Sequence, residues 1–455
     1  MTPLRTGVLN LWEVLAQSIA MLGPTLTPVL IVPLMFASAG NASWLAYAFG
    51  SLLLLAIAFN IREFAIRSSS AGSLYEFARR AFGARGSALC GWTLLWAYGL
   101  VGIAGLTGFV VFAKALAGMA HASVPGIAAL TFCLVVALAF AYRDIRLSTI
   151  TLLLIEASSV TVITVLLALV IAHHGTLVDP DQLQLRGTKL SGIALGTTIA
   201  IFSLVGFESA TALGEEARDP LRTIPAAVIL SVIVSGVFFV VCAYVEVLSA
   251  HGLSATLDKL GTPLDALADA ARVPAFKVAI DAGAMLSSFS ITLAAMNASA
   301  RIAFDMSRTR VFPSLLGRTH QTFRTPHVAL VAFALVCGAV GGGMLLGGIS
   351  PLESFNDTAT LGSFGFITIY AFVTLGAPVY LRRIGALRSR HIVVAAVTLA
   401  LLLIPAVGSV YPVPPAPTNA FPYIFAGYVL LGIGMLWRSA GRRDDAAFPP
   451  EASSG

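Results

Sequence analysis

The chain has 455 residues, of which 57% are hydrophobic and only 11% are charged, and its formal net charge at pH 7 is +6. A soluble domain of this length needs far more charge on its surface, so the composition excludes a soluble globular protein and indicates a membrane protein. The positive balance does not indicate nucleic acid as a partner, because the basic residues lie singly or in pairs in short loops, where membrane topology explains them.

Twelve apolar runs follow one another along the chain, and each is long enough to cross a bilayer as an α-helix. A helix satisfies its own backbone polar groups in lipid, so the sequence predicts an all-α membrane protein with twelve transmembrane helices. Between the second and third runs, the amphipathic segment 71–84 is predicted to lie as a helix at the cytoplasmic interface. The runs lie at 13–37, 42–65, 88–117, 124–142, 147–172, 191–213, 224–249, 276–303, 327–348, 357–381, 391–410 and 421–438.

The distribution of Lys and Arg predicts the orientation. A cytoplasmic amino terminus places 22 of these 28 residues in cytoplasmic segments and 6 in outer ones. Positive charge concentrates on the cytoplasmic side of membrane proteins, so this split supports an even number of spans with both termini cytoplasmic. All four cysteines fall within apolar runs and are interpreted as small hydrophobic residues, so we expect no disulfide framework, metal site or cofactor.

The first apolar run contains two prolines four residues apart, Pro24 and Pro28. Each removes a backbone donor, so a regular helix cannot pass smoothly through this stretch. Such a break persists in lipid only where it is buried in protein or lines a wet cavity, and a simple proline kink is the alternative interpretation. The candidate binding residues at this break are Gly23, Thr25, Leu26 and Thr27.

The sixth run has its own weak point, where Gly206 and the ionisable Glu208 lie deep in the span. Interrupted helices at the first and sixth positions predict an inverted-repeat transporter with a binding site near the bilayer midplane. The half-helix after the first break offers N–H groups and a positive dipole end to a carboxylate, and unwound carbonyls in the sixth run suit an ammonium group. The candidate residues at the second break are Phe202, Ser203, Val205, Gly206 and Phe207.

Two carboxylates, Glu208 and Glu156, lie deepest in apolar runs. An ionised carboxylate in hydrocarbon is costly, so each should face the bundle interior or carry a proton. We assign both to coupling or gating, with a structural hydrogen-bonding role as the alternative. Glu63, Glu246 and Asp305 lie nearer the ends of runs, where we expect interfacial pairing.

Three stretches resemble one known family of transporters. The first leads from Glu63 to Tyr75 and on to the Gly91-Trp92 pair. The second and most specific is 202–209 followed by 215–225, and the third begins at Asn297-Ala-Ser-Ala-Arg301. In all three the chain resembles the amino acid–polyamine–organocation (APC) permeases. Runs one to ten follow this resemblance in order, whereas runs eleven and twelve match only in hydropathy.

The resemblance implies the LeuT-like fold, in which a 5+5 inverted repeat has broken first and sixth helices. The transport core would occupy 1–380, with repeats at about 13–172 and 191–380. Two accessory helices at 391–438 and a cytoplasmic tail at 439–455 would follow.

The same resemblance implies roles for individual residues. The break at 25–28 should bind a substrate carboxylate, and the carbonyls around Phe202, Ser203 and Val205 should bind its amine. Phe202 takes the place of an aromatic gate, and Glu208 that of a pH-linked glutamate. Glu156 aligns approximately with a lysine of the fifth span that replaces a sodium site in some proton-coupled members of the family. A glutamate at this position reverses the sign of the charge.

One departure from the family concerns the first break. The family usually has Gly-Ser/Thr-Gly there, whereas Pro24, Leu26 and Pro28 occupy this stretch in the present chain. Decarboxylated amines and other small organic ions therefore stay open as substrates.

The sequence thus predicts a secondary permease for an amino acid or related amine, acting by proton-coupled symport or exchange. Its partners would be the substrate, a proton and the lipid bilayer, without nucleic acid. A uniporter or channel-like facilitator of small organic ions is the alternative, although no selectivity-filter loop is visible. An enzyme is not expected, because the sequence offers no nucleophile or metal constellation and no loop long enough for a catalytic domain.

Overall fold

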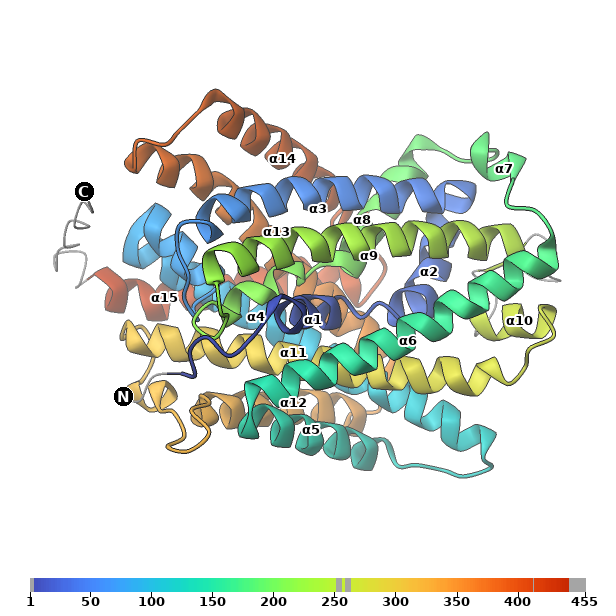
Figure 1. Ribbon diagram of the computed structural model, residues 1–455, viewed down its shortest axis with the longest axis horizontal. Helices are drawn as coiled ribbons and strands as arrows, with labels where there is room; N and C mark the ends of the chain where they lie inside the picture. Colours follow the sequence, from blue (N-terminus) through green and yellow to red (C-terminus); the bar gives the residue numbers. More distant parts are fainter. Residues whose placement is uncertain (1–3, 251–255, 258–262, 412, 442–455) are drawn as a thin grey trace.

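The computed structural model describes residues 4–250, 256–257, 263–411 and 413–441. Within these ranges the chain is helical, and its only β-type pairing is an isolated bridge between Leu9 and Ala217 (Figure 1). Eleven described stretches are long and apolar enough to cross a membrane, and the first of them, Leu11–Ala65, contains the first two predicted runs. The prediction of an all-α protein with many membrane-spanning helices is therefore confirmed, with eleven candidate stretches that correspond to the twelve predicted runs.

The amino-terminal part begins with a well-capped helix, α1 (Leu11–Leu22). The Asn10 side chain accepts from the N–H of Glu13 (3.1 Å), while the Glu13 carboxylate accepts from the N–H of Asn10 (2.8 Å), which satisfies donors that the helix leaves free. A π-helical turn, η1 (Thr27–Ile31), and a short helix, α2 (Val32–Ala39), follow. The turn η2 (Gly40–Ala42) then leads into α3 (Ser43–Ala65).

Helix α4 (Leu74–Met119) is longer than the predicted third run, because the segment before Gly83 joins it across a kink. At the kink Gly83 has φ 77° and ψ −165°, outside the helical region. The predicted helix in 71–84 is present from Leu74 onward, and its position at the membrane interface stays a prediction. Leu74 and Phe77 are buried, and the Phe77 ring stacks on Phe64 of α3 with centroids 5.1 Å apart.

The other elements lie within a few residues of the predicted runs, apart from short helices and turns between them. The predicted tail at 439–455 lies almost wholly outside the described residues. The elements are α5 (Gly126–Arg143), α6 (Ile145–His174), α7 (Pro180–Leu183), α8 (Leu190–Leu204), η3 (Phe207–Leu213), α9 (Pro220–Ala250), α10 (Pro263–Ala270), α11 (Phe276–Arg308), η5 (Ser314–Gly317), α12 (His327–Leu346), α13 (Pro351–Arg383), α14 (Ser389–Gly408), η6 (Thr418–Ala420) and α15 (Phe421–Gly441).

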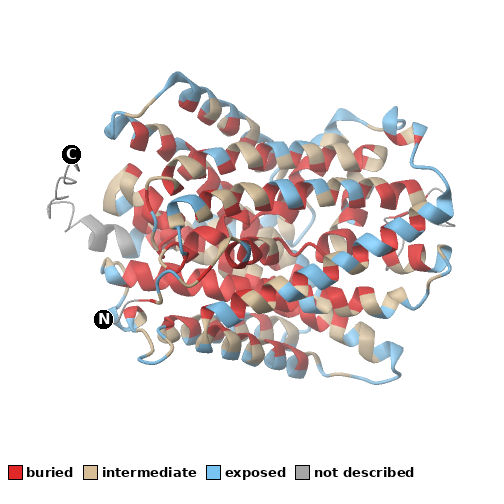
Figure 2. Ribbon diagram, viewed as in Figure 1, coloured by how far each residue is buried: buried red, intermediate tan, exposed pale blue. Residues whose placement is uncertain are grey.

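Burial divides the helices into a central and a peripheral set, as Figure 2 shows. Helices α1 and α11 are buried on nearly every side, whereas α5, α12 and α14 direct large apolar side chains outward. Phe132, Leu335 and Leu403 are each more than 60% exposed. Exposed apolar side chains of this kind suit contact with lipid acyl chains rather than with water.

The central helices determine where the site lies. Helix α1 packs against α6, α9 and α11, and α4 packs against α11 and α13. Helix α3 lies along α9. Helices α14 and α15 lie at the edge of the bundle, where α14 packs on α13 and α15 packs on α4 (Figure 1).

Candidate functional site

The first interruption of regular helix follows α1. Gly23 takes the left-handed conformation with φ 57°, and a Cβ atom there would overlap the Ile291 side chain of α11. The N–H groups of Leu26 and Thr27 then turn back to the Gly23 carbonyl, at 2.9 and 3.4 Å. Regular α-helix resumes only with α2, so the chain from Gly23 to Ile31 runs as turns and a π-helical segment.

The second interruption follows α8. Val205 is extended, and Gly206 has φ 90°, a left-handed conformation that side chains with a Cβ rarely adopt. A Cβ atom at Gly206 would overlap the Met21 side chain of α1. The close approach of α1 therefore gives Gly206 a second reason to be glycine, besides its backbone conformation.

Hydrogen bonds join α1, which ends at the first interruption, to η3, which begins directly after the second. The Ser18 hydroxyl of α1 donates to the Phe207 carbonyl (2.5 Å) and accepts from the Ala210 N–H (3.1 Å). One residue earlier, the Gln17 carbonyl accepts from the Ser209 hydroxyl (3.2 Å). Helix α1 and η3 are thus held side by side, although nearly 200 residues separate them in the sequence.

Glu208 lies at the centre of a three-helix contact. Its carboxylate accepts one hydrogen bond from the Tyr98 hydroxyl of α4 (2.7 Å) and another from the Tyr370 hydroxyl of α13 (2.6 Å). Tyr370 in turn accepts from the Gly206 N–H (3.1 Å), and all four residues are buried. We call Tyr98, Glu208 and Tyr370 the tyrosine–glutamate latch. It ties η3 to α4 and α13.

The sequence reasoning found Glu208 but missed both of its tyrosine partners. Tyr98 and Tyr370 lie within long apolar runs. A tyrosine in such a run can be a core residue or a ligand-binding residue, and the sequence alone does not distinguish the two. The available signal was a phenol deep in a span, which needs a hydrogen-bond partner when it is buried.

Glu156 faces the bundle interior from α6. The Ser287 hydroxyl of α11 lies 3.2 and 3.3 Å from its two carboxylate oxygens. One turn along, the Ser159 hydroxyl donates to the Gly283 carbonyl (3.4 Å). A Cβ atom at Gly283 would lie 3.7 Å from the Thr25 side chain, so this polar contact of α6 with α11 lies beside the first interruption.

The predicted residues of the first interruption differ in their surroundings. Thr25 and Thr27 are 1% and 0% exposed, and neither hydroxyl has a hydrogen-bond partner among the described residues. Leu26 instead packs into an apolar cluster with Ile291 and Cys242. The threonines are therefore the side chains here that could still bind a polar ligand.

The predicted residues of the second interruption are also mostly buried. The Ser203 hydroxyl lies 3.0 Å from the Tyr47 hydroxyl of α3. Val205 and Phe207 pack in the core, where the Phe207 ring lies 5.5 Å from that of Tyr370. Phe202 is half-buried. The structure thus brings most of the predicted site residues into one central region, around α1, η3 and α11.

A buried ion pair lies among the second and third stretches that carry the family resemblance. Arg301 of α11 donates to both carboxylate oxygens of Glu216, at 2.6 and 2.8 Å, and both side chains are 1% exposed. The Glu216 carbonyl accepts from the N–H groups of Val8 and Leu9, at 2.9 and 3.0 Å. The chain before α1 is therefore tied to the segment that follows η3.

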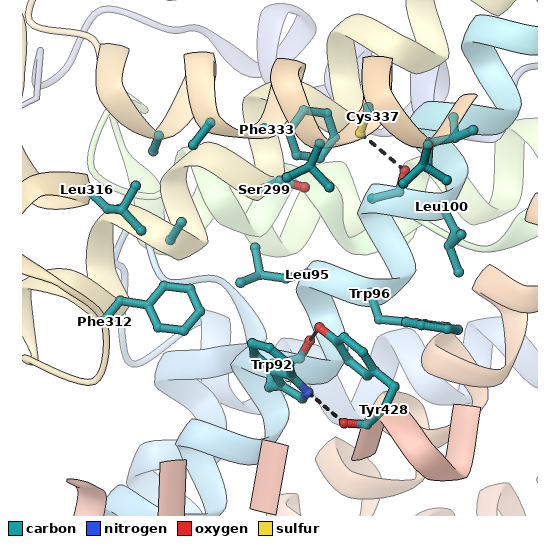
Figure 3. Close-up of a pocket in the computed structure, with 17 residues that line it drawn as sticks. Trp92, Leu95, Trp96, Leu100, Ser299, Phe312, Leu316, Phe333, Cys337 and Tyr428 are labelled. Carbon is teal, nitrogen blue, oxygen red and sulfur yellow. Dashed lines mark hydrogen bonds between the residues drawn. The ribbon is translucent and has the colours of Figure 1, made fainter. Parts of the chain in front are cut away.

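An apolar groove of about 550 Å³ lies between α4, α11, α12 and α15, away from both interruptions (Figure 3). At its edge the Trp92 and Tyr428 rings stack with centroids 4.6 Å apart. Each also donates to the other's backbone carbonyl at 2.9 Å. None of the predicted site residues lines this groove, which is thus separate from the candidate site.

Metal ligands do not gather in the part of the chain that the structure describes, where no group of three His, Cys, Asp or Glu residues could hold an ion. The four cysteines are buried and unpaired.

Comparison with known proteins identifies the family. Residues 9–434 match the family model described as amino acid permease. The chain belongs to the amino acid permease family. The predicted resemblance to permeases is thereby confirmed, and the protein is an integral, multi-pass membrane transporter rather than an enzyme.

Among its relatives, this permease is 26% identical to the branched-chain amino acid permease BcaP of Bacillus subtilis, over 76% of this chain and 74% of that protein. It is also 26% identical to the low-affinity putrescine importer PlaP of Escherichia coli, over 72% and 71% of the two chains. A methylthioribose transporter of Bacillus subtilis is 25% identical over 74% of each.

Among solved structures, the permease superposes on a manganese transporter of Eremococcus coleocola with a TM-score of 0.59. The match covers 95% of both chains at 13% sequence identity. At this identity the similarity shows a shared fold and nothing of the cargo.

Proposed function

We propose that this permease is a secondary transporter for an amino acid or a related amine, working by proton-coupled symport or exchange with alternating access. One observation carries the proposal: the end of α1, just before the first interruption, lies against Gly206 of the second, and the threonine hydroxyls of the first are buried without partners among the described residues. Irregular backbone inside a membrane protein is tolerated where it is buried in protein or lines a cavity, and in transporters it marks the substrate site.

The proposed architecture is the LeuT-like 5+5 inverted repeat, with repeats at about 13–172 and 191–380. The interruptions after α1 and α8 would be the broken first and sixth helices. Helices α14 and α15 would be the accessory pair, which their position at the edge of the bundle supports. Both termini would be cytoplasmic, as the distribution of Lys and Arg favours.

The substrate carboxylate would bind at the first interruption. The hydroxyls of Thr25 and Thr27 are buried without partners, and buried polar groups in this condition cost free energy until a ligand satisfies them. The Gly23 conformation lets the backbone turn here. Leu26 would contribute an apolar wall.

The substrate amine would bind at the end of α8. A helix leaves its last four carbonyls without intrahelical partners, so the carbonyls near Phe202 and Ser203 face the second interruption. Carbonyl oxygens oriented in this way attract an ammonium group. Phe202 would cover the substrate as a gate, with Val205, Gly206 and Phe207 forming the rest of the wall.

Coupling would act through the tyrosine–glutamate latch. A carboxylate accepts both tyrosine hydrogen bonds, whereas a protonated carboxyl gains a donor and loses an acceptor site. A change of protonation at Glu208 would therefore alter the attachment of η3 to α4 and α13. Glu156, which joins α6 to α11 through Ser287, would be the second coupling or gating carboxyl.

Uptake into proteoliposomes tests the proposal. The names of the relatives suggest a panel that contains leucine, putrescine and methylthioribose, beside arginine and alanine as further amino acids. We expect saturable, exchangeable uptake of at least one panel compound, and a loss of at least tenfold in Thr25→Val. Thr161→Val, an exposed threonine of α6 that bonds only its own helix, is the control and should leave uptake unchanged.

Two outcomes would contradict the proposal. Unitary currents far above transporter turnover would favour the channel-like alternative. Saturable uptake that a pH gradient neither accelerates nor drives above equilibrium would favour a uniporter. A thermal-shift screen of the same panel would identify ligands independently, because a compound that binds the folded state raises its apparent stability.

A further inference from the structure

One buried carboxyl has no role in the proposed mechanism and no partner in the structure. Glu246 of α9 is 0% exposed, and neither of its carboxyl oxygens has a hydrogen-bond partner among the described residues. The interfacial pairing that its sequence position predicted is wrong. Four other buried carboxyls, those of Glu13, Glu156, Glu208 and Glu216, have partners, and Glu246 differs from these four.

Helix α9, which carries Glu246, packs against elements that form the proposed substrate site. It packs against α3, η1 and η3, and its Ser231 hydroxyl lies 3.3 Å from the Phe207 carbonyl. Tyr47 of α3 is an electrostatic neighbour of Glu246, and its hydroxyl bonds that of Ser203 at the end of α8. A charge at Glu246 would thus be felt where the substrate amine is proposed to bind.

Among the residues that the structure describes, no basic side chain pairs with Glu246. Tyr47 and Cys242 are its electrostatic neighbours among the titratable residues. Other carboxyls lie on elements packed against α9, and we name them because each could titrate in parallel. They are Glu13 on α1, Glu63 on α3, Glu156 on α6, Glu208 on η3, and Asp265 and Asp269 on α10.

A hollow of about 280 Å³ lies one turn beyond Glu246. Ser249 of α9 lines it together with His173 and His174 at the end of α6. Both histidines are exposed, so this end of the bundle is open to water. Because Ser249 lies three positions after Glu246 on α9, the hollow reaches this helix within about one turn of the carboxyl.

We propose that Glu246 is a proton-binding site of the permease, separate from Glu208 and Glu156, and that it exchanges its proton through the hollow lined by Ser249. A buried ionised carboxylate without a partner is very costly in a membrane protein, and one bound proton removes that cost. The step is a proton transfer from water to a carboxylate oxygen, in which no other bond changes. Its role in coupling rests on the transport function proposed above.

Infrared spectroscopy tests the bound proton without any substrate. Detergent-solubilised wild type and Glu246→Gln would be compared at neutral pH through the carbonyl stretching band of protonated carboxyl groups. We expect the wild-type minus variant spectrum to show one lost carboxyl. The control Glu63→Gln removes a carboxylate that pairs with Arg67 at 2.7 Å and should leave the band unchanged. An unchanged band in Glu246→Gln would overturn the proposal.

Glu246→Asp keeps an ionisable group in case the glutamine variant does not fold. It should shift the band rather than abolish it, whereas an identical band would contradict the assignment. A sodium-dependent increase in thermal stability that disappears in Glu246→Gln would show that the site holds a metal cation, and would also overturn the proposal.

Transport measurements distinguish a failure of the Glu246 proposal from a failure of the proposed transport function. The probe would be the panel compound that wild type transports, measured in exchange without a gradient and in accumulation driven by a pH gradient. We expect Glu246→Gln to keep exchange and to lose at least tenfold in accumulation. Accumulation at the wild-type level would overturn the coupling role of Glu246. Absence of any wild-type transport would overturn the proposed function instead, while the infrared result would still test the proton site.

Discussion

The guanidinium of Arg301 and the carboxylate of Glu216 form a bidentate ion pair with N–O distances of 2.6 and 2.8 Å. Both side chains are buried, each 1% exposed. A third Arg301 nitrogen donates to the Asn297 carbonyl at 2.9 Å. The pair joins α11 to the segment after η3, on which the residues before α1 also rest.

Removal of one partner from this pair should be strongly destabilising. In Arg301→Ala the Glu216 carboxylate stays buried without a counter-charge, a situation that typically costs about 3–5 kcal/mol. We expect a large fall in apparent Tm, measured by tryptophan fluorescence in detergent. The neighbouring pair of Arg308 and Glu215 is partly exposed, so Glu215→Gln should cost at most about 1 kcal/mol. An equal effect of the two variants would contradict this assignment.

Alanine at Gly206 should destabilise the permease through both backbone and packing. A left-handed residue with a Cβ costs roughly 1–2 kcal/mol, and the added methyl would also overlap Met21. Gly342 of α12 is the matched control, since a Cβ there meets nothing within 4 Å. We expect Gly206→Ala to lower both Tm and uptake, and Gly342→Ala to leave both nearly unchanged. Wild-type behaviour of Gly206→Ala would show that the second interruption has a different conformation.

The two tyrosines of the latch should not be equivalent. Tyr98→Phe removes one donor to Glu208, which typically costs about 1.5–3 kcal/mol for a hydrogen bond to a charged group. Tyr370→Phe also leaves the Gly206 N–H without its acceptor, so its effect on Tm should be larger. The exposed Tyr423 offers a control, and Tyr423→Phe should be neutral. We expect Tm to be lowest for Tyr370→Phe, higher for Tyr98→Phe and unchanged for Tyr423→Phe. Equal Tm values for Tyr98→Phe and Tyr370→Phe would contradict the prediction that the two tyrosines differ.

Glu208→Gln should fold, because an amide can still accept one of the two tyrosine hydrogen bonds. It cannot exchange a proton, so the pH dependence of uptake should become flatter than in wild type. Uptake of the transported panel compound, followed over a range of external pH, measures this directly. A profile identical to that of wild type would remove Glu208 from the coupling role.

Helix positions could be predicted from this sequence because the bilayer requires a continuous apolar stretch of nearly fixed length. The runs at 42–65 and 327–348 correspond to α3 and α12 almost residue for residue. The segment 71–84 shows what a local pattern leaves out. Its amphipathic pattern predicts a helix, whereas the packing of its apolar side chains, such as the stacking of Phe77 on Phe64 of α3, depends on distant parts of the chain.

Contacts between spans could not be predicted, because they depend on helix rotation and register rather than on local pattern. Glu208 stood out as a charge in an apolar run, yet Tyr98 and Tyr370 are single phenols more than 100 residues away. Glu246 was misjudged for the opposite reason. Its position near the end of a run indicated interfacial pairing, whereas its side chain is fully buried on a helix packed along α3 and has no hydrogen-bond partner among the described residues.

The double hydrogen bond of Ser18 has a mechanical consequence. Because one hydroxyl serves two backbone groups of η3, the end of α1 and η3 cannot swing apart without losing both bonds at once. We therefore expect α1 and η3 to move together as one rigid body relative to the surrounding helices. A cross-link that fixed only one of them would then arrest both.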